Sequence, residues 1–365
     1  MKRHLSALSL CLIVVLQGSC MDIKNLTLDQ KIGQLFMVAT VADEDIAKDF
    51  MHHKTYRLDK EYITDLIAQY QIGGILYLGP SDVEKQIERT AYFQRISAIP
   101  LLVGQDLEPG RVGGARLPMM RDFPNNEKLG NGNDEQRTYE TALAIGNICK
   151  SLGVHINFSP VADVNNNPNN PVINDRAFSG DVATVAQHAI AFARGLADAG
   201  IIACAKHFPG HGDTDVDSHY DLPKITYDKK RLHAIELYPF KQLIAADIPV
   251  IMIAHLEIPA FEPQKNVPSS LSKNIVTKLL RQELGYKGLI ITDGLDMRGV
   301  THYYSDGQAE LQALLAGNDI LLGPVNVPAA VAAIKQALSQ GLIAEQEIDA
   351  HVQRILHLKK LAGLC

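Results

Sequence analysis

The chain contains no tryptophan, which excludes a binding site that stacks ligand rings on indole. It has no run of basic residues beyond its first few positions, and its formal net charge is −6 at pH 7. Because nucleic acids bind through clustered Lys and Arg side chains, we do not expect them as partners. No long linker rich in proline, glycine and serine interrupts the sequence, so we expect residues 21–365 to form a single domain.

Cysteine is scarce, and no two cysteines have the CxxC spacing of a metal or redox motif. Three of the five cysteines lie beyond the N-terminal segment, at Cys149, Cys204 and Cys365. An odd number without characteristic spacing predicts no disulfide framework. Because Cys149 and Cys204 lie in apolar runs, we expect both to be buried free thiols.

The apolar run at residues 5–16 is too short to span a bilayer. It follows a basic start and leads into Gly18-Ser19-Cys20, an arrangement that resembles a bacterial lipoprotein signal. Gln17 departs from the Leu or Val that such signals prefer. We expect residues 1–20 to be a signal peptide that is cleaved before Cys20, which would carry the lipid; ordinary secretion and an unprocessed chain are the alternatives. The expected location is the periplasm or cell envelope, with the lipid as the only membrane contact.

Eight short apolar runs alternate with longer amphipathic segments, as in parallel α/β folds. The expected strands are residues 34–39, 74–78, 101–104, 156–159, 201–205, 250–254, 289–292 and 319–322. The expected helices after the first strand are residues 61–70, 83–96, 135–152, 182–199, 229–246, 272–284, 307–315, 327–340 and 344–361. This alternation favours a single (β/α)8 TIM-like barrel, with a doubly wound open sheet as the alternative.

Polar and ionisable residues follow five consecutive expected strands. They are Asp106 and Glu108, Asp163 and Arg176, Lys206 and His207, His255, and Asp293. In a parallel barrel, the carboxyl ends of all strands open on the same mouth, so these side chains would converge there. The sequence therefore predicts a site at this end of the barrel.

Asp293 follows four apolar strand residues, a position that would fix its carboxylate and partly remove it from water. Such a carboxylate could serve as a covalent nucleophile. The alternative is a structural Asp that caps the next helix or turn, a role that Asp296 could fill equally well.

The segment 206–219 combines three histidines, three aspartates and a lysine with two glycines and a proline. Asp217 could orient the imidazole of His219 for general acid and base catalysis, although Asp-x-His is more often a solvated loop pair. A rival interpretation makes this segment a metal site, with ligands among His207, His211, Asp213, Asp217 and His219. The spacing matches no zinc pattern, so we expect neither a metal nor a cofactor.

Three cationic or neutral donors could bind hydroxyl or carbonyl groups of a substrate, namely Arg176, Lys206 and His207. Arg176 could instead pair with Asp175 or Asp163. Asp106 could accept hydrogen bonds from two hydroxyl groups, or could merely end a strand.

Several segments match one enzyme family in order and spacing. They are KHFPGHGDT and DSH within 206–219, DLEPGRV at 106–112, NFSPVAD at 157–163, NDRAF at 174–178, MIAH at 252–255 and ITDGLDM at 291–297. Together they resemble family 3 glycoside hydrolases of the β-N-acetylhexosaminidase (NagZ-like) branch, over residues 25–363. The resemblance implies a TIM-like barrel and a retaining, two-step hydrolysis.

The resemblance also assigns roles to individual residues. Asp293 would be the nucleophile, and His219, oriented by Asp217, would be the proton donor and acceptor. The residues that would bind the terminal N-acetylglucosamine are Asp106, Arg116, Arg176, Lys206 and His207. Arg116 stands two residues beyond the family's usual arginine, whose position is Gly114 here, and Arg111 is the other candidate. Gly294 replaces a polar residue that is common beside the nucleophile.

The implied activity is removal of terminal N-acetylglucosamine from peptidoglycan fragments or chitooligosaccharides. A β-glucosidase or a glycoside phosphorylase of the same family is the alternative, and a metal-dependent barrel hydrolase is another. From a different class, a surface lipoprotein that binds glycans without cleaving them would lack the combination of Asp293, Asp217 and His219.

Overall fold

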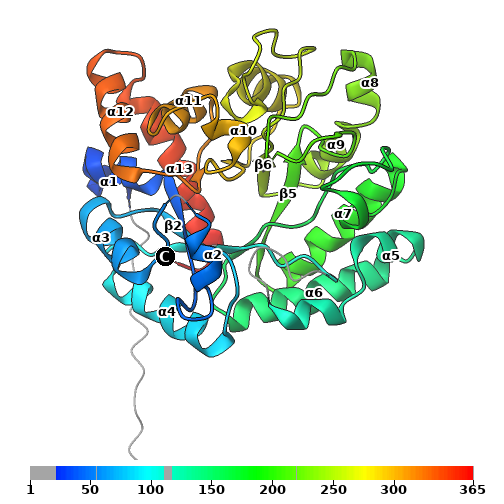
Figure 1. The fold of residues 1–365 in the computed structure, drawn as a ribbon, viewed down its shortest axis with the longest axis horizontal. Coiled ribbons are helices and arrows are strands. Elements are labelled where there is room, and N and C mark those ends of the chain that lie inside the picture. Colours follow the sequence, from blue (N-terminus) through cyan, green and yellow to red (C-terminus); the bar gives the residue numbers. More distant parts are fainter. Residues whose placement is uncertain (1–21, 55, 111–116, 219, 365) are drawn as a thin grey trace, which may run out of the picture.

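A computed structural model describes residues 22–54, 56–110, 117–218 and 220–364. Its centre is a sheet of eight strands in the order β7-β6-β5-β4-β3-β2-β1-β8, and every pairing along that order is parallel. The strands are β1 Phe36–Thr40, β2 Gly74–Tyr77, β3 Leu102–Gln105, β4 Ile156–Asn157, β5 Ile202–Phe208, β6 Val250–Ile253, β7 Leu289–Thr292 and β8 Leu321–Leu322. Figure 1 shows the helices arranged around this sheet.

The two ends of the sheet meet and nearly close the barrel. Thr292 N donates to Ile320 O at 3.1 Å, and Ile320 N donates to Ile290 O at 3.1 Å. The prediction of a (β/α)8 TIM-like barrel is therefore confirmed, and all eight expected strands are present. Strand residues are buried throughout, as expected for a parallel sheet covered by helices.

The expected helices are present with one division and small shifts at their ends. The α-helices are α1 Leu28–Gln34, α2 Lys48–His52, α3 Lys60–Tyr70, α4 Val83–Ile96, α5 Asn126–Asn131, α6 Glu135–Ser151, α7 Val182–Asp198, α8 Lys229–Ala234, α9 Tyr238–Ala245, α10 Arg298–Thr301, α11 Gln308–Ala316, α12 Val327–Ser339 and α13 Glu345–Leu361. The short 3₁₀ helices are η1 Ile23–Asn25, η2 Pro118–Asp122, η3 Asn174–Arg176 and η4 Ser269–Leu271, and η5 Asn274–Glu283 is π-helical.

Two expectations about element boundaries were wrong. The helix expected at 229–246 is divided into α8 and α9, because Pro239 cannot donate a helical hydrogen bond and its ring fits only the first turn of α9. The strand expected at 201–205 extends to Phe208, although Lys206 and His207 are polar. Both side chains are buried against carboxylates, which offsets the cost of placing them in the barrel.

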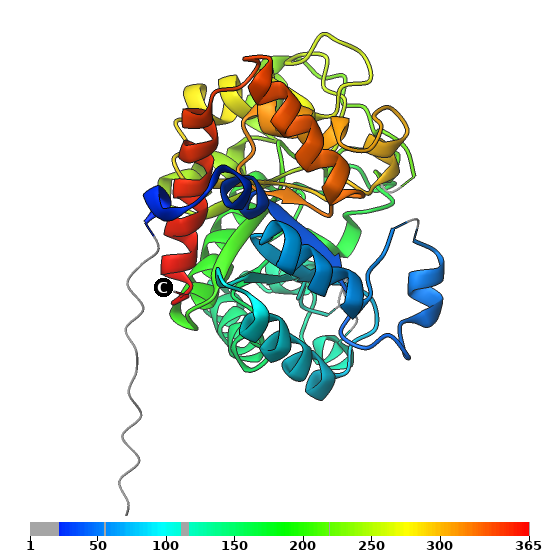
Figure 2. The same cartoon turned by 90° about the vertical axis from the view of Figure 1, so that its left-hand side faces the viewer.

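Helix α13 packs across the amino-terminal end of the strands, on the side opposite the barrel mouth (Figure 2). Its buried Lys359 donates to Pro100 O before β3 at 2.6 Å. The fully buried Asp319, just before β8, accepts from His351 Nδ1 and Arg354 Nε of this helix, each at 2.7 Å, and pairs with Arg281. These contacts hold the last helix against the amino-terminal end of the barrel, which is its floor.

The segment 41–59 between β1 and α3 forms a surface excursion, which stands out from the end of the barrel opposite α13 in Figure 2. Its Val41, Ala47 and Leu58 form a small apolar cluster with Ala39 of β1. Within the described part of the chain, no helix has the length and apolar character needed to cross a membrane. Cys149 and Cys204 are buried free thiols, as predicted.

Candidate active site

A cavity of about 630 Å³ lies at the carboxyl ends of the strands. It is lined by Phe50, Lys54, Leu76, Leu78, Asp106, Glu108, Pro171, Val172, Arg176, Lys206, His207, His211, Asp217, Ser218, Met252, Asp293, Gly294, Asp296, Met297 and Leu322. Six predicted site residues are therefore brought together, from strand β5 and the loops that follow strands. Arg116, its alternative Arg111, His219 and Cys20 lie outside the described residues.

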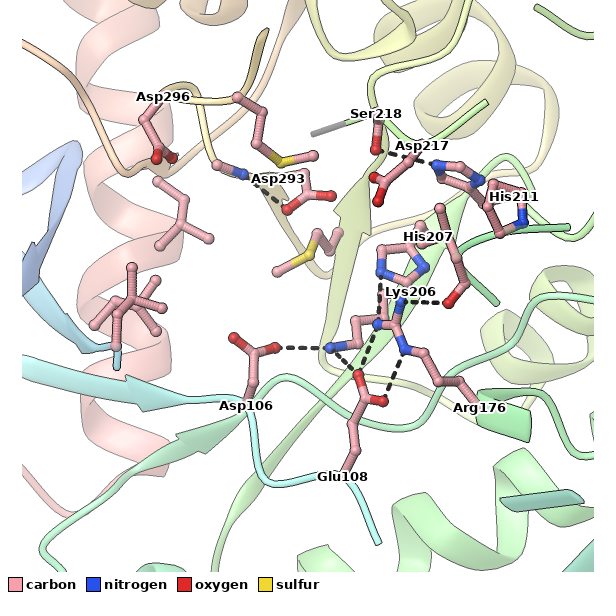
Figure 3. Close-up of a pocket in the computed structure, with 18 of the residues that line it drawn as sticks. Asp106, Glu108, Arg176, Lys206, His207, His211, Asp217, Ser218, Asp293 and Asp296 are labelled. Atoms are coloured by element: carbon pink, nitrogen blue, oxygen red, sulfur yellow. Dashed lines mark hydrogen bonds and ion pairs between the residues drawn. The ribbon is translucent and has the colours of Figure 1, made fainter. Parts of the chain in front are cut away.

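A cluster of four charged side chains occupies one side of the cavity (Figure 3). Lys206 Nζ lies 2.7 Å from Asp106 Oδ1 and 2.8 Å from Glu108 Oε1. Arg176 donates to both oxygens of Glu108, from Nη2 at 2.7 Å and from Nε at 2.9 Å. Glu108 thus orients both cations. Of the two alternative partners considered for Arg176, Asp175 accepts from Asn125 and Asp163 binds His207.

In this cluster, burial and the neighbouring charges shift the pKa values in opposite directions, and the charges have the larger effect. Burial alone would raise the pKa of Glu108, but Arg176 and Lys206 hold its pKa well below the usual range. Burial alone would lower the pKa of Lys206, but Asp106 and Glu108 raise it. The pKa of Arg176 is raised against the effect of burial by Glu108. Glu108, Lys206 and Arg176 therefore remain ionised around neutral pH.

His207 is held by the fully buried Asp163, whose Oδ2 lies 2.7 Å from His207 Nδ1. A carboxylate accepts here, so Nδ1 carries a proton and Nε2 is directed toward Arg176 Nη2, 3.4 Å away. Asp163 Oδ1 also accepts from the backbone N of His211 at 2.6 Å. Burial would raise the pKa of Asp163, but His207 and His211 lower it.

Asp293 follows β7 and faces the cavity together with Asp217 (Figure 3). Gly294 N donates to Asp293 Oδ1 at 2.8 Å. Next to this turn, the fully buried His255 places Nε2 2.9 Å from Gly294 O. Because a carbonyl can only accept, Nε2 carries the proton, and Nδ1 accepts from Ser270 Oγ at 2.7 Å. His255 therefore supports the turn that carries Asp293.

The loop that carries Asp217 is held together through His211. His211 Nε2 lies 3.2 Å from Ser218 Oγ, and Nδ1 lies 2.8 Å from Thr214 Oγ1. Burial, followed by the neighbouring His207, lowers the pKa of His211 to about 4. His211 is therefore neutral at physiological pH and links the two halves of the loop.

Asp296 does not cap a helix, since the residue that precedes α10 is Met297. Its Oδ2 instead accepts from Tyr56 OH at 2.6 Å and from Lys54 Nζ at 3.0 Å, both on the 41–59 excursion. A Cβ atom at Gly294 would lie 2.7 Å from Asp296 Oδ1. The glycine beside Asp293 thus leaves room for the Asp296 carboxylate.

Three of the described members of the metal-binding set considered above have separate partners. His207 is bound to Asp163, His211 to Thr214 and Ser218, and Asp213 Oδ2 lies 3.3 Å from Arg231 Nη2. Within residues 22–54, 56–110, 117–218 and 220–364, no group of three or more His, Cys, Asp or Glu side chains is arranged to hold a metal ion.

Sequence reasoning missed two contributors to the site, Phe50 and Lys54, and the central role of a third, Glu108. Glu108 was recognised at the end of a strand, but its partners lie 68 and 98 positions further along the chain, so its central place could not be read from local pattern. Phe50 and Lys54 lie in the 41–59 excursion, outside every expected strand and helix. The mixture of aromatic and basic residues in that segment was the available signal.

Residues 27–358 match the model of the family described as "Glycosyl hydrolase family 3 N terminal domain". The chain belongs to this family, as the motifs predicted. It is 35% identical over 327 residues to the protein named beta-hexosaminidase A of Pseudoalteromonas piscicida, covering 81% of this chain and 54% of that protein. It is 34% identical over 305 residues to beta-hexosaminidase LpqI of Mycobacterium tuberculosis, covering 80% of this chain and 77% of the relative.

Among solved structures, a family 3 beta-N-acetylglucosaminidase from Paenibacillus sp. superposes with a TM-score of 0.81 and 36% sequence identity. That match covers 93% of this chain and 63% of the Paenibacillus chain. The present chain thus spans little more than half of the P. piscicida protein and less than two thirds of the Paenibacillus chain. The shared part is the barrel described above.

Proposed function

We propose that this protein is a retaining exo-β-N-acetylhexosaminidase that removes terminal N-acetylglucosamine from peptidoglycan fragments or chitooligosaccharides. The observation that carries the proposal is one cavity lined both by Asp293 and Asp217 and by the cluster around Lys206. The names of the relatives support the choice of sugar. A single carboxylate at the end of a strand, without the other residues of this cavity, would support only a hydrolase of unspecified substrate.

In the first chemical step, an oxygen of Asp293 attacks the anomeric carbon, and the bond from that carbon to the leaving oxygen breaks. His219, oriented by Asp217, gives its proton to the leaving oxygen. In the second step, His219 takes a proton from water while the water oxygen attacks the same carbon and releases Asp293. Two displacements at one carbon retain its configuration.

The charged cluster would hold the terminal sugar beside Asp293. The Asp106 side chain is 23% exposed, whereas the Glu108 side chain is only 6% exposed. Asp106 is therefore the carboxylate able to accept hydrogen bonds from sugar hydroxyls, and Glu108 fixes the cations behind it. Lys206 and Arg176 supply N–H donors that are already oriented, which lowers the entropic cost of binding.

Release of nitrophenol from aryl N-acetyl-β-glucosaminide and aryl β-glucoside, with and without EDTA, tests the proposal. Preference for the N-acetyl substrate, unchanged by EDTA, is expected. Preference for the glucoside would replace the proposed specificity with that of a β-glucosidase. Loss of activity in EDTA would restore the metal-dependent hydrolase, and a rise in rate with added phosphate would indicate a phosphorylase. No release from either substrate would contradict the proposed activity.

We also propose that the protein is exported and anchored in the cell envelope by a lipid on Cys20. The apolar run at 5–16 and the Gly18-Ser19-Cys20 sequence support this location. Labelled palmitate should enter the wild-type protein and not Cys20→Ala. Equal labelling of the two proteins would refute the anchor.

A further inference from the structure

The 41–59 excursion contributes two side chains to the cavity, Phe50 and Lys54. Among the described residues that line the cavity, Phe50 supplies the one phenyl ring. This ring is half-buried and lies over Gly79, where an added Cβ would come within 2.7 Å of Phe50 Cδ1. One side of the Phe50 ring therefore packs against Gly79, while part of the ring faces the cavity.

The excursion is fastened to the barrel at two places. At its beginning, Asp43 Oδ2 lies 2.6 Å from Lys85 Nζ, and Glu44 Oε1 lies 2.9 Å from Arg89 Nη1, both on α4. Near its end, the hydroxyl of Tyr56 donates to Asp296. A ligand that rests on the excursion meets a surface that is already ordered, so little conformational entropy is lost on binding.

The excursion and the sugar-binding cluster lie on opposite sides of the barrel mouth. The cluster comes from β5 and the loops that follow β3 and β4, whereas the excursion follows β1 and contacts the turn after β7. Strands β1 and β7 both flank β8, away from β4. Figure 3 accordingly shows Asp293 between the cluster and Asp296. A glycan whose terminal sugar lies at the cluster can extend past Asp293 toward the excursion.

We propose that Phe50 and Lys54 form the subsite for the leaving sugar, and that this sugar is an uncharged hexosamine ring. The inference rests on the proposed hydrolase function. The apolar face of a pyranose ring packs against the phenyl ring, which buries C–H groups of the sugar. Lys54 Nζ binds Asp296 and lies 5.5 Å from the centroid of the Phe50 ring, so its N–H donors are held beside the position of the stacked sugar, within reach of its hydroxyl groups.

Charge around the cavity determines which leaving sugar fits. Lys54, the cation that the excursion brings to the cavity, is balanced by Asp296 at 3.0 Å. A leaving sugar that carries a carboxylate, such as N-acetylmuramic acid, would therefore have to compete with Asp296 for Lys54. The subsite suits chitooligosaccharides better than fragments that end in an acidic sugar.

The test compares kcat/KM for chitobiose with kcat/KM for methyl N-acetyl-β-glucosaminide, whose leaving group is too small to reach Phe50. Phe50→Ala should lower the chitobiose-to-methyl ratio about tenfold, the upper range for loss of one aromatic contact. Phe50→Tyr keeps the ring and should preserve the ratio within about twofold. Ile46→Ala, an exposed position on the same excursion that does not line the cavity, is the matched control and should leave the ratio unchanged.

Phe50→Leu serves if Phe50→Ala does not fold, because leucine keeps apolar volume while losing the flat ring; its ratio should also fall. An unchanged ratio in an active Phe50→Leu or Phe50→Ala protein overturns the subsite alone. A wild-type protein that cleaves neither substrate overturns the proposed function and the subsite with it. Faster cleavage of the disaccharide that ends in N-acetylmuramic acid than of chitobiose overturns the assignment of an uncharged sugar.

Discussion

Replacing Glu108 by glutamine should destabilise the protein strongly at neutral pH. The wild-type residue is 4% exposed, and its carboxylate receives Arg176 at 2.7 and 2.9 Å and Lys206 at 2.8 Å. The substitution Glu108→Gln would keep the shape of the side chain but remove its charge, and the new NH₂ group would face donors. Breaking a buried ion pair by removing one partner costs about 3–5 kcal/mol of unfolding free energy.

The effect should depend on pH in a defined direction. The folded-state pKa of Glu108 lies below its unfolded-state pKa, which is about 4.3. The stabilisation of the folded protein by this carboxylate is therefore fully present above the unfolded-state pKa. The contribution is lost as the pH falls through the lower, folded-state pKa. The difference in unfolding free energy between the wild type and Glu108→Gln should therefore narrow below about pH 4.3.

Urea unfolding followed by far-ultraviolet circular dichroism measures this difference, since the chain has no tryptophan to report by fluorescence. Glu88→Gln, at an exposed site on α4, is the control and should change the unfolding free energy by less than about 0.5 kcal/mol. A loss below about 1 kcal/mol in Glu108→Gln at pH 7, or a difference that stays constant down to about pH 3, would refute the reasoning.

Four further substitutions have defined outcomes. Asp293→Ala should lower turnover about 10³-fold or more, and His219→Ala about 10²–10⁴-fold on unactivated glycosides; near-wild-type rates in either would refute that residue's role. Gly294→Ala should cost about 1–3 kcal/mol in urea unfolding, because its methyl group would overlap Asp296 Oδ1; full stability would mean that the turn adjusts freely. Asp319→Asn should lower the unfolding free energy by about 3–5 kcal/mol but leave KM unchanged, and a shifted KM would show that the floor and the mouth are coupled.

The strands could be located from the sequence because a parallel strand buried on both faces appears as a short apolar run. Residues 289–292, for example, have the same limits in the prediction and in β7. The end of β5 was missed because Lys206 and His207 look like loop residues until their carboxylate partners are known. Pro239 was a visible break within residues 229–246, and its effect was underestimated.

The position of the site could also be predicted, because residues that follow parallel strands must share one mouth. What could not be predicted was the pairing among them. Arg176 binds Glu108, 68 residues earlier, rather than the adjacent Asp175, and only the three-dimensional arrangement of two loops decides between them. The same limit applies to Asp296, whose partner Tyr56 lies 240 positions away.

The buried ion pairs at the two ends of the barrel affect which mutations this protein can tolerate during evolution. The cluster around Asp319 secures the floor through residues that do not line the substrate cavity. Mutations that reshape the loops at the mouth leave those ion pairs intact, so the barrel retains that part of its stability while new specificities are sampled. The 41–59 excursion, joined to the barrel at a few side-chain contacts, is the segment where such variation would cost the fold least.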